Sequence, residues 1–258
     1  MKHTPRKRFG QHFLVDEAVL AELVHHIDPQ AGQVLVEVGP GPGALTHRLL
    51  AQGARLTAIE LDRDLARALQ GVPGLHIICA DVLTVDFAAL STQLAGPLRV
   101  VGNLPYNIST PILFHLDQAW HCVHDMHFML QKEVVQRMVA PVGDAAYGRL
   151  SVMLQWRWEM EMLMSVPPEA FDPPPAVNSA VVRLLPRATE RPVDQALLSE
   201  VVAVAFSQRR KLLRHTLGPW LQNRAAPGVA FDLQRRAQEV SVQQYLQLVL
   251  QLQAAAAA

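Results

Sequence analysis

Short apolar runs alternate with amphipathic segments along the first 140 residues, and breakers such as glycine, proline or aspartate separate many of them. Apolar runs of about five or six residues are typical of buried strands, whereas apolar residues three or four apart indicate helices. This pattern predicts strands at 33–38, 55–60, 75–80, 98–103 and 124–131. It predicts helices at 17–27, 44–52, 62–70, 111–120 and 132–140. Strands that alternate with helices imply an α/β fold, in which a parallel sheet carries helices on both faces.

The pattern changes in the second half of the chain. "VNSAVVRLL" (177–185) predicts a late strand, which we expect at the sheet's antiparallel edge. Beyond it no strand pattern is convincing, and helices are expected at 196–206, 209–221 and 241–252. We therefore expect a main domain over residues 1–187, whose first 15 residues form a basic N-terminal arm, and a small all-helical domain over residues 188–258.

Composition excludes several classes of protein. Half of the 258 residues are hydrophobic and 18% are charged, which suits a packed core and argues against disorder. No apolar run reaches the roughly 18 residues of a membrane-spanning helix, and no apolar stretch follows the basic N-terminus as in a secretory signal. The two cysteines, Cys79 and Cys122, show no pairing pattern. A reducing cytoplasm is the expected location.

The net charge of zero hides an uneven distribution. Residues 2–12 carry a charge of +4, residues 187–258 carry +4, and residues 13–186 between them carry −8. Basic ends around an acidic body indicate a polyanionic partner, although solvated surface charge would give the same asymmetry. The candidate phosphate-binding residues lie in the arm and on one predicted helix of the second domain: Arg6, Lys7, Arg8, Arg209, Arg210, Lys211 and Arg214.

A ligand pocket is expected where the first strands end. Gly39, Gly41 and Gly43 form a strand-to-helix turn, at which the backbone can approach a ligand and the helix N-terminus favours an anionic group. Glu60 ends the next strand and can accept two hydrogen bonds from a ribose diol. Asp81 follows the third strand and can accept from an adenine amino group. An adenosine-containing cofactor is expected, but "GPGPGA" also satisfies the G-x-G-x-x-A pattern of dinucleotide-binding proteins.

The stretch "NLPYNIST" (103–110) follows the fourth strand at the same edge. The Asn103 carboxamide oxygen and a nearby main-chain carbonyl can together accept both hydrogens of an exocyclic amine. Tyr106 offers a ring for stacking a planar base, a contact worth about 1–3 kcal/mol, and Pro105 stiffens the turn. These groups suit methyl transfer to the N6 of adenine, because positioning supplies most of the acceleration and no strong general base is needed beforehand. An ordinary loop with a proline turn is the alternative.

Seven motifs together resemble one family: "RKRFGQHFL", "VEVGPGPGALT", "AIELD", "NLPYNIST", "MLQKEV", "YGRLSV" and "FDPPPAVNSAVVRL". They resemble the bacterial small-subunit ribosomal RNA adenine dimethyltransferases, the KsgA/RsmA family, and the resemblance extends from about residue 6 to residue 217. The resemblance implies a Rossmann-like S-adenosylmethionine-dependent methyltransferase sheet. It also implies dimethylation of two adjacent adenosines in the 3′-terminal hairpin of small-subunit RNA, by a monomer acting on an assembling 30S subunit.

The resemblance also implies roles for single residues. Those expected to bind S-adenosylmethionine are His12, Leu14, Gly39, Gly41, Glu60, Asp81 and Asn103. Those expected to bind the target adenosine are Asn103, Leu104 through its carbonyl, Pro105, Tyr106 and Phe171, the last as a second stacking face. Two positions depart from the family pattern, since His12 stands where asparagine is frequent and Ala176 where lysine is common.

Other readings stay open at this point. A large-subunit RNA methyltransferase that confers antibiotic resistance would share the pocket, and an NAD-linked oxidoreductase or a non-catalytic assembly factor could share the fold. The cluster His121, Cys122, His124 and His127 suggests a metal site, but His124 and His127 fall on opposite faces of an extended segment and no second ligand pair follows. No metal is expected.

Overall fold

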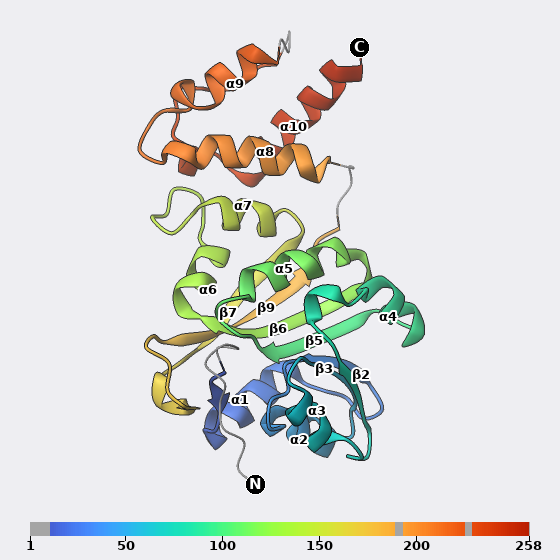
Figure 1. The fold of residues 1–258 in the computed structure, drawn as a ribbon. Coiled ribbons are helices and arrows are strands. Elements are labelled where there is room, and N and C mark those ends of the chain that lie inside the picture. Colours follow the sequence, from blue (N-terminus) through green and yellow to red (C-terminus); the bar gives the residue numbers. More distant parts are fainter. Residues whose placement is uncertain (1–10, 189–192, 225–228, 258) are drawn as a thin grey trace. The chain divides into compact units, whose positions relative to one another are not determined.

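The computed structural model describes residues 11–188, 193–224 and 229–257, which form two compact units (Figure 1). The first unit comprises the chain up to Val135 together with Met160–Pro186, and the second comprises Gln136–Glu159 together with the chain from Arg187 onward. The second unit thus includes a segment that the expected boundary near residue 187 places in the first domain. That boundary, as a division into domains, stays a prediction.

A seven-stranded sheet forms the centre of the first unit. Its strands are β2 (Val34–Val38), β3 (Arg55–Glu60), β4 (Leu75–Cys79), β5 (Leu98–Asn103), β6 (Val123–Gln131), β7 (Trp158–Val166) and β9 (Ser179–Pro186). They lie in the order β4-β3-β2-β5-β6-β9-β7. The five strands from β4 to β6 are parallel, and β9 runs antiparallel to β6, with Leu184 opposite Met126. The predicted parallel sheet and the antiparallel direction of the late strand are confirmed.

The predicted edge position of that late strand is wrong, because β7 lies outside it. β9 is buried along most of its length, whereas β7 is buried only at its two ends. In β7, Glu159 and Glu161 alternate with methionines, which gives an edge strand one solvated face. The continuous apolar run in β9 is the pattern of an inner strand.

Helices cover both sides of the sheet, as Figure 1 shows, with α1 (Glu17–Ile27), α2 (Ala44–Ala51) and α3 (Arg63–Leu69) on one side and α4 (Phe87–Gln93) and α5 (Ser109–Gln118) on the other. The Asp16 carboxylate caps α1 by accepting from the amides of Ala18 and Val19, and Asp62 caps α3. The helix α4 was not predicted from the sequence. A core beneath α1 and α2 joins Leu23, Leu49 and Val101.

A second, two-stranded sheet was not predicted. Its strands, β1 (Phe13–Leu14) and β8 (Phe171–Asp172), are antiparallel and place Leu14 opposite Phe171. The amides of Val15 and Asp16 both donate to the Ala170 carbonyl and continue this contact. These strands are too short for a periodic signal, so their pairing depends on tertiary contacts.

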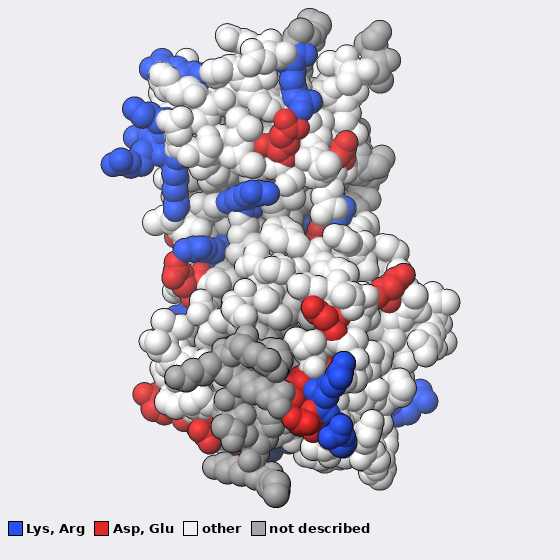
Figure 2. Space-filling view, in the orientation of Figure 1, with Lys and Arg blue, Asp and Glu red and all other residues white. Residues whose placement is uncertain are grey.

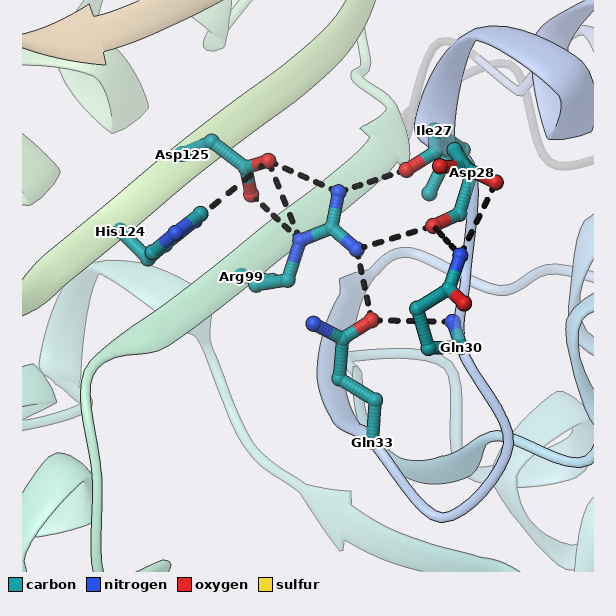
Figure 3. Close-up of polar contacts among 7 residues, drawn as sticks. All are labelled: Ile27, Asp28, Gln30, Gln33, Arg99, His124 and Asp125. Carbon is teal, nitrogen blue, oxygen red and sulfur yellow. Dashed lines mark hydrogen bonds and ion pairs between the residues drawn. The ribbon is translucent and has the colours of Figure 1, made fainter.

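A buried guanidinium ties strands to the end of α1, as Figure 3 shows. Arg99 on β5 donates to both carboxylate oxygens of Asp125 on β6, over 2.8–3.1 Å. It also donates to the Ile27 carbonyl over 2.6 Å and to the Gln33 amide oxygen over 2.7 Å. The side chains of Arg99 and Asp125 are 9% and 7% exposed. The charges are therefore paired with each other, and the guanidinium also satisfies main-chain carbonyls where α1 ends.

The second unit is helical. It contains α7 (Arg149–Gln155), α8 (Gln195–Ala205), α9 (Leu217–Asn223) and α10 (Val242–Ala257), and α8 contacts the other three. α6 (Lys132–Val139) passes from the first unit into the second. Within the described residues, no helix has the length and apolar character that crossing a membrane requires.

The helix predicted over 209–221 is wrong in its first half. The main chain there forms a turn and a short 3₁₀ helix, Leu213–His215, and α9 begins only at Leu217. The amides of Leu213 and Arg214 donate to the carbonyls of Arg235 and Leu233 rather than to their own preceding turn. A distant segment has therefore taken the hydrogen bonds that a continuous helix needs.

We predict that Asp125→Asn lowers the free energy of unfolding by about 3–5 kcal/mol, because it leaves a buried guanidinium without its counter-charge. The matched control is Glu161→Gln, which removes an exposed carboxylate 2.7 Å from Arg183 in the same unit. The control should cost about 1 kcal/mol or less. Urea denaturation measures both, and equal losses would contradict the prediction.

Candidate active site

A pocket opens where the chain order of the sheet reverses. The chain leaves β2 toward β3 on one side and leaves β5 toward β6 on the other, so the loops at the carboxyl ends of β2 and β5 diverge. The cavity there measures about 270 Å³. Its lining includes every residue expected to hold the cofactor and four of the five expected at the target: His12, Leu14, Gly39, Gly41, Glu60, Asp81, Asn103, Leu104, Pro105 and Tyr106.

The glycine turn is held against the end of β3. Gly41 has a φ of +57° and donates its amide to a Glu60 carboxylate oxygen over 3.1 Å. A Cβ at this position would lie 3.0 Å from the Phe13 ring. Gly41 therefore meets a conformational requirement, and a Cβ there would also oblige the Phe13 ring to shift by a few tenths of an ångström.

Glu60 is 7% exposed and accepts two main-chain hydrogen bonds, from Gly41 and, over 2.8 Å, from Asp62. Burial raises its pKa, while the hydrogen bonds from Asp62 and Gly41 act in the opposite direction. Each carboxylate oxygen has two lone pairs, so Glu60 can still accept from ligand hydroxyls. Asp81 also accepts a main-chain hydrogen bond, from the Leu83 amide to one carboxylate oxygen over 2.9 Å.

Glu37 is a pocket residue that the sequence analysis missed. It is 2% exposed, and the Thr46 hydroxyl donates to one of its carboxylate oxygens over 2.7 Å. Burial raises the pKa of Glu37 to about 7, against the hydrogen bond from Thr46. A cation placed beside Glu37 would stabilise its charged form. Its signal in the sequence was an acid inside the apolar run "VLVEV", where a structural residue would be apolar.

The Asn103–Tyr106 turn lies across the pocket from the glycines. The Asn103 carboxamide nitrogen donates to the His12 main-chain carbonyl over 2.8 Å, and the Leu104 amide donates to the Met129 carbonyl over 3.1 Å. The Tyr106 hydroxyl is hydrogen-bonded to Ser179, and burial raises the pKa of Tyr106. These bonds fix the turn from both sides and leave the Asn103 carboxamide oxygen as an acceptor at the pocket.

Gly102 brings these two loops together, and sequence analysis did not single it out. A Cβ on Gly102 would lie 2.4 Å from the Val38 carbonyl oxygen, which is impossible without moving β5 away from β2. The main-chain carbonyl of Asn103 lies 3.9 Å from where a Cβ would stand at Gly39. The glycine before Asn103 thus permits a close backbone approach, a reading that only the pairing of β2 with β5 makes possible.

Phe171 is not part of this pocket lining. It is 3% exposed and belongs to the core beneath α1 and α2, opposite Leu14 in the small sheet. The structure therefore places Phe171 in the core, behind the pocket-lining Leu14 with which it pairs. Its expected role as a second stacking face stays a prediction.

Three comparisons identify relatives. The model of the family described as "Ribosomal RNA adenine dimethylase" matches residues 2–254. The chain belongs to this family. A relative from Methylibium petroleiphilum, named ribosomal RNA small subunit methyltransferase A, is 63% identical over 252 residues, 98% of each chain.

Solved structures agree on the fold of this adenine dimethylase family. A dimethyladenosine transferase from Plasmodium falciparum has a TM-score of 0.77 at 22% identity, over 95% of this chain and 98% of that one. The 23S rRNA methyltransferase ErmE has a TM-score of 0.66 at 24% identity, over 93% and 99%. The chain therefore has the Rossmann-like methyltransferase fold with a helical C-terminal part.

The residues present fit S-adenosylmethionine, the methyl donor of this family. Gly41 keeps the turn free of side-chain atoms, and Glu60 and Asp81 present carboxylates at the ends of neighbouring strands. Glu37 adds a buried carboxyl that a cationic donor would favour in its ionised form. The dinucleotide alternative is set aside by the family membership.

The basic residues expected to contact RNA do not form one uniform surface. Arg6, Lys7 and Arg8 lie outside the described residues. Arg209 is engaged within the protein, donating to the carbonyls of Ala145 and Tyr147, which leaves Arg210 and Lys211 as exposed neighbours. Figure 2 shows lysine and arginine side chains gathered along one edge of the second unit.

The pH dependence of stability should identify the buried carboxyl at Glu37. The pKa of Glu37 is about 7 in the folded protein and near the ordinary 4.5 in the unfolded chain. Between pH 4.5 and 7 the folded protein therefore keeps a proton on Glu37 that the unfolded chain has released. Stability from this group is therefore present below pH 4.5 and falls as pH rises through 7, by about 3 kcal/mol in total. Glu37→Gln should lack that loss.

Urea denaturation of both proteins between pH 4.5 and 8.5 measures the effect. The Glu37→Gln protein should become progressively more stable than the wild type as pH rises. Glu161→Gln, at an exposed position, is the control. Parallel stability curves for the wild type and the Glu37→Gln protein would contradict the assignment.

Proposed function

We propose that this protein transfers methyl groups from S-adenosylmethionine to the N6 of two adjacent adenosines in the 3′-terminal hairpin of small-subunit ribosomal RNA. The observation that carries the proposal is the Asn103–Tyr106 turn, which faces the glycine turn across one pocket. Membership of the adenine dimethylase family and the names of its close relatives support the same reaction.

Methyl transfer requires the protein mainly to position the target amine and the methyl donor. S-adenosylmethionine supplies, when bound, an electrophilic methyl group on a sulfonium. The Asn103 carboxamide oxygen accepts a hydrogen bond from one N–H of the target amine, and the Leu104 carbonyl accepts a hydrogen bond from the other N–H. These acceptors favour a pyramidal nitrogen, whose lone pair is then available for attack along the methyl–sulfur axis.

Stacking on the Tyr106 ring holds the target base, since Tyr106 is fixed at its hydroxyl by Ser179. The target nitrogen becomes acidic only as the methyl group arrives, so its proton can leave to water afterwards. Pro105, which stiffens the turn, keeps the acceptors and the ring in one arrangement. Phe171 would add a second stacking face only if its ring left the core.

We propose an assembling 30S subunit as the substrate particle, and a monomer in the cytoplasm as the acting form. The exposed Arg210 and Lys211, with Arg214 and the N-terminal Arg6, Lys7 and Arg8, are proposed to contact RNA phosphates. Arg209 is better explained as a structural residue, because its guanidinium binds main-chain carbonyls.

Two alternatives remain distinguishable by experiment. A large-subunit methyltransferase would label the other subunit, and the similarity to ErmE supports only the shared fold. A non-catalytic assembly factor would bind small subunits without labelling them. The identity of about 60% with several small-subunit methyltransferases favours the proposed substrate.

The test uses S-adenosylmethionine with a labelled methyl group and small subunits from a strain that lacks the modification. Label is expected as dimethyladenosine in the 3′-terminal hairpin. Asn103→Ala should lower transfer by about a thousandfold, because it removes an acceptor at the reacting nitrogen. Its dissociation constant for S-adenosylmethionine should change far less.

Gln118→Ala is the control, since this exposed carboxamide at the end of α5 lies outside the pocket lining. It should retain transfer within a few-fold of the wild type. Full activity of the Asn103→Ala protein would refute the assigned role. Absence of label with the wild-type protein would refute the proposed substrate.

RNA affinity should fall steeply with salt, because each lysine or arginine at a phosphate releases counterions. A Lys211→Ala protein should show a smaller slope of log affinity against log salt, by about one unit. Arg187→Ala is a suitable control, since its guanidinium donates to the Trp158 carbonyl and is already engaged. A filter-binding titration with the hairpin RNA measures the slopes, and identical slopes for wild type and Lys211→Ala would remove Lys211 from the interface.

A further inference from the structure

One short segment, His12–Leu14, contacts four separate parts of the site. The His12 carbonyl accepts from Asn103, and the His12 ring stacks on Tyr106 with centroids 5.7 Å apart and planes inclined by 21°. Phe13 lies beside Gly41, and both Phe13 and Leu14 pair with the strand that begins at Phe171. A shift of this segment would therefore move Asn103 and Tyr106, the residues proposed to bind the target adenosine.

The contact with Asn103 decides which way its carboxamide faces. A carboxamide presents a donor on one side and an acceptor on the other. Because the nitrogen is committed to the His12 carbonyl over 2.8 Å, the oxygen must take the opposite side. The proposed reaction requires that oxygen as an acceptor. If the carboxamide were rotated by about 180°, its NH₂ group would face the N–H groups of the target amine, and two donors would meet.

The His12 carbonyl is itself held in place by the His12 side chain. The imidazole Nδ1 lies 2.7 Å from the Pro173 carbonyl oxygen. A carbonyl only accepts, so Nδ1 carries the hydrogen and donates it. Pro173 follows β8, and the β1–β8 pairing brings it beside a residue 161 positions earlier in the chain.

We propose that His12 is a positioning residue for methyl transfer, whose Nδ1–H···Pro173 hydrogen bond and stacking on Tyr106 hold the main-chain carbonyl that orients Asn103. This inference rests on the proposed function, since it concerns the acceptor that the reaction uses. It differs from the role in cofactor binding that the family resemblance implies for His12. The difference is measurable, because a cofactor ligand would act through affinity and a positioning residue acts through the rate of transfer.

The proposal explains the departure of this chain from the family pattern. An asparagine nitrogen and a histidine Nδ1 are each bonded to Cγ, so both place an N–H the same number of bonds from the main chain. Asparagine at position 12 can therefore donate to the Pro173 carbonyl as histidine does. Glutamine places its nitrogen one bond farther away and cannot reproduce this contact without moving the main chain.

The experiment compares His12→Asn with His12→Gln, two polar variants that differ by one methylene group, and His12→Ala. Single-turnover transfer to the hairpin-bearing subunit gives the rate, and calorimetry gives the dissociation constant for S-adenosylmethionine. His12→Asn should stay within about fivefold of the wild-type rate. His12→Gln and His12→Ala should lose about tenfold to a hundredfold, as small misplacements of reacting groups do.

The dissociation constant should change by less than about threefold in all three variants, and urea denaturation should show that each is folded. Equal rates for the Asn and Gln variants would overturn the proposal. A loss found entirely in cofactor affinity would also overturn it and assign His12 to the cofactor site instead.

A second readout does not depend on any reaction. The side-chain amide of Asn103, assigned from its absence in the Asn103→Ala spectrum, should show slow hydrogen exchange in the wild type and in His12→Asn. Exchange should be faster by about tenfold or more in His12→Gln, because the amide has lost its partner. If the wild-type protein transferred no methyl group but this pattern held, the proposed function would fail and the orienting contact would stand. Equal exchange in both variants would refute the contact whatever the activity.

Discussion

The close parallel contact between β2 and β5 is the constraint on which the site depends. It is possible because Gly102 has no side chain, since a Cβ there would lie 2.4 Å from the Val38 carbonyl oxygen. The same contact is the point where the chain order reverses, so the loops after Val38 and Gly102 face each other across a crevice. One loop is the glycine turn and the other is the Asn103–Tyr106 turn. The lack of a side chain at Gly102 thus lets the glycine turn and the Asn103–Tyr106 turn line one pocket.

Buried charged groups are paired at one end of the sheet and lack a paired cation, in the described residues, at the other. Near the beginning of β5, Arg99 is paired with Asp125 and donates to carbonyls at the end of α1, which closes that end with charge-assisted hydrogen bonds. At the opposite end, Glu37 and Glu60 are buried without a paired cation in the described residues, and burial raises the pKa of both. The first arrangement stabilises the fold. The second leaves carboxyls available to a cationic ligand.

The N-terminal segment completes the pocket from a distant part of the sequence. Its strand β1 pairs with β8, and His12 links Asn103, Tyr106 and Pro173. A reaction that relies on two hydrogen-bond acceptors rather than on a strong base depends on how firmly those acceptors are aimed. Under the proposed function the segment serves that need, because it contacts both Asn103 and Tyr106.

The basic residues of the second unit do not all have the same role, although the charge asymmetry alone does not distinguish them. Arg209 binds the carbonyls of Ala145 and Tyr147 and so stabilises the second unit, although it stands in the same charge run as Arg210 and Lys211. A run of like charges in the sequence does not distinguish a structural guanidinium from a solvated one. The hydrogen-bond partners do, and here they come from a segment more than sixty residues away.

The sequence by itself determined strands β2 to β6 and β9 and helices α1, α2, α3 and α5 of the first unit, because periodicity is a local property. It also determined which residues line the pocket on the glycine and Asn103 sides, since the ends of parallel strands meet at one edge of a sheet. Only the tertiary structure decided which groups surround Gly102, Glu37 and the His12 side chain. It alone decided that β7 forms the edge, that Phe171 is buried and that the chain around Leu213 is not α-helical. Each of these depends on hydrogen bonds or packing between distant segments, and no local pattern records which partner a main-chain group or a side chain will meet.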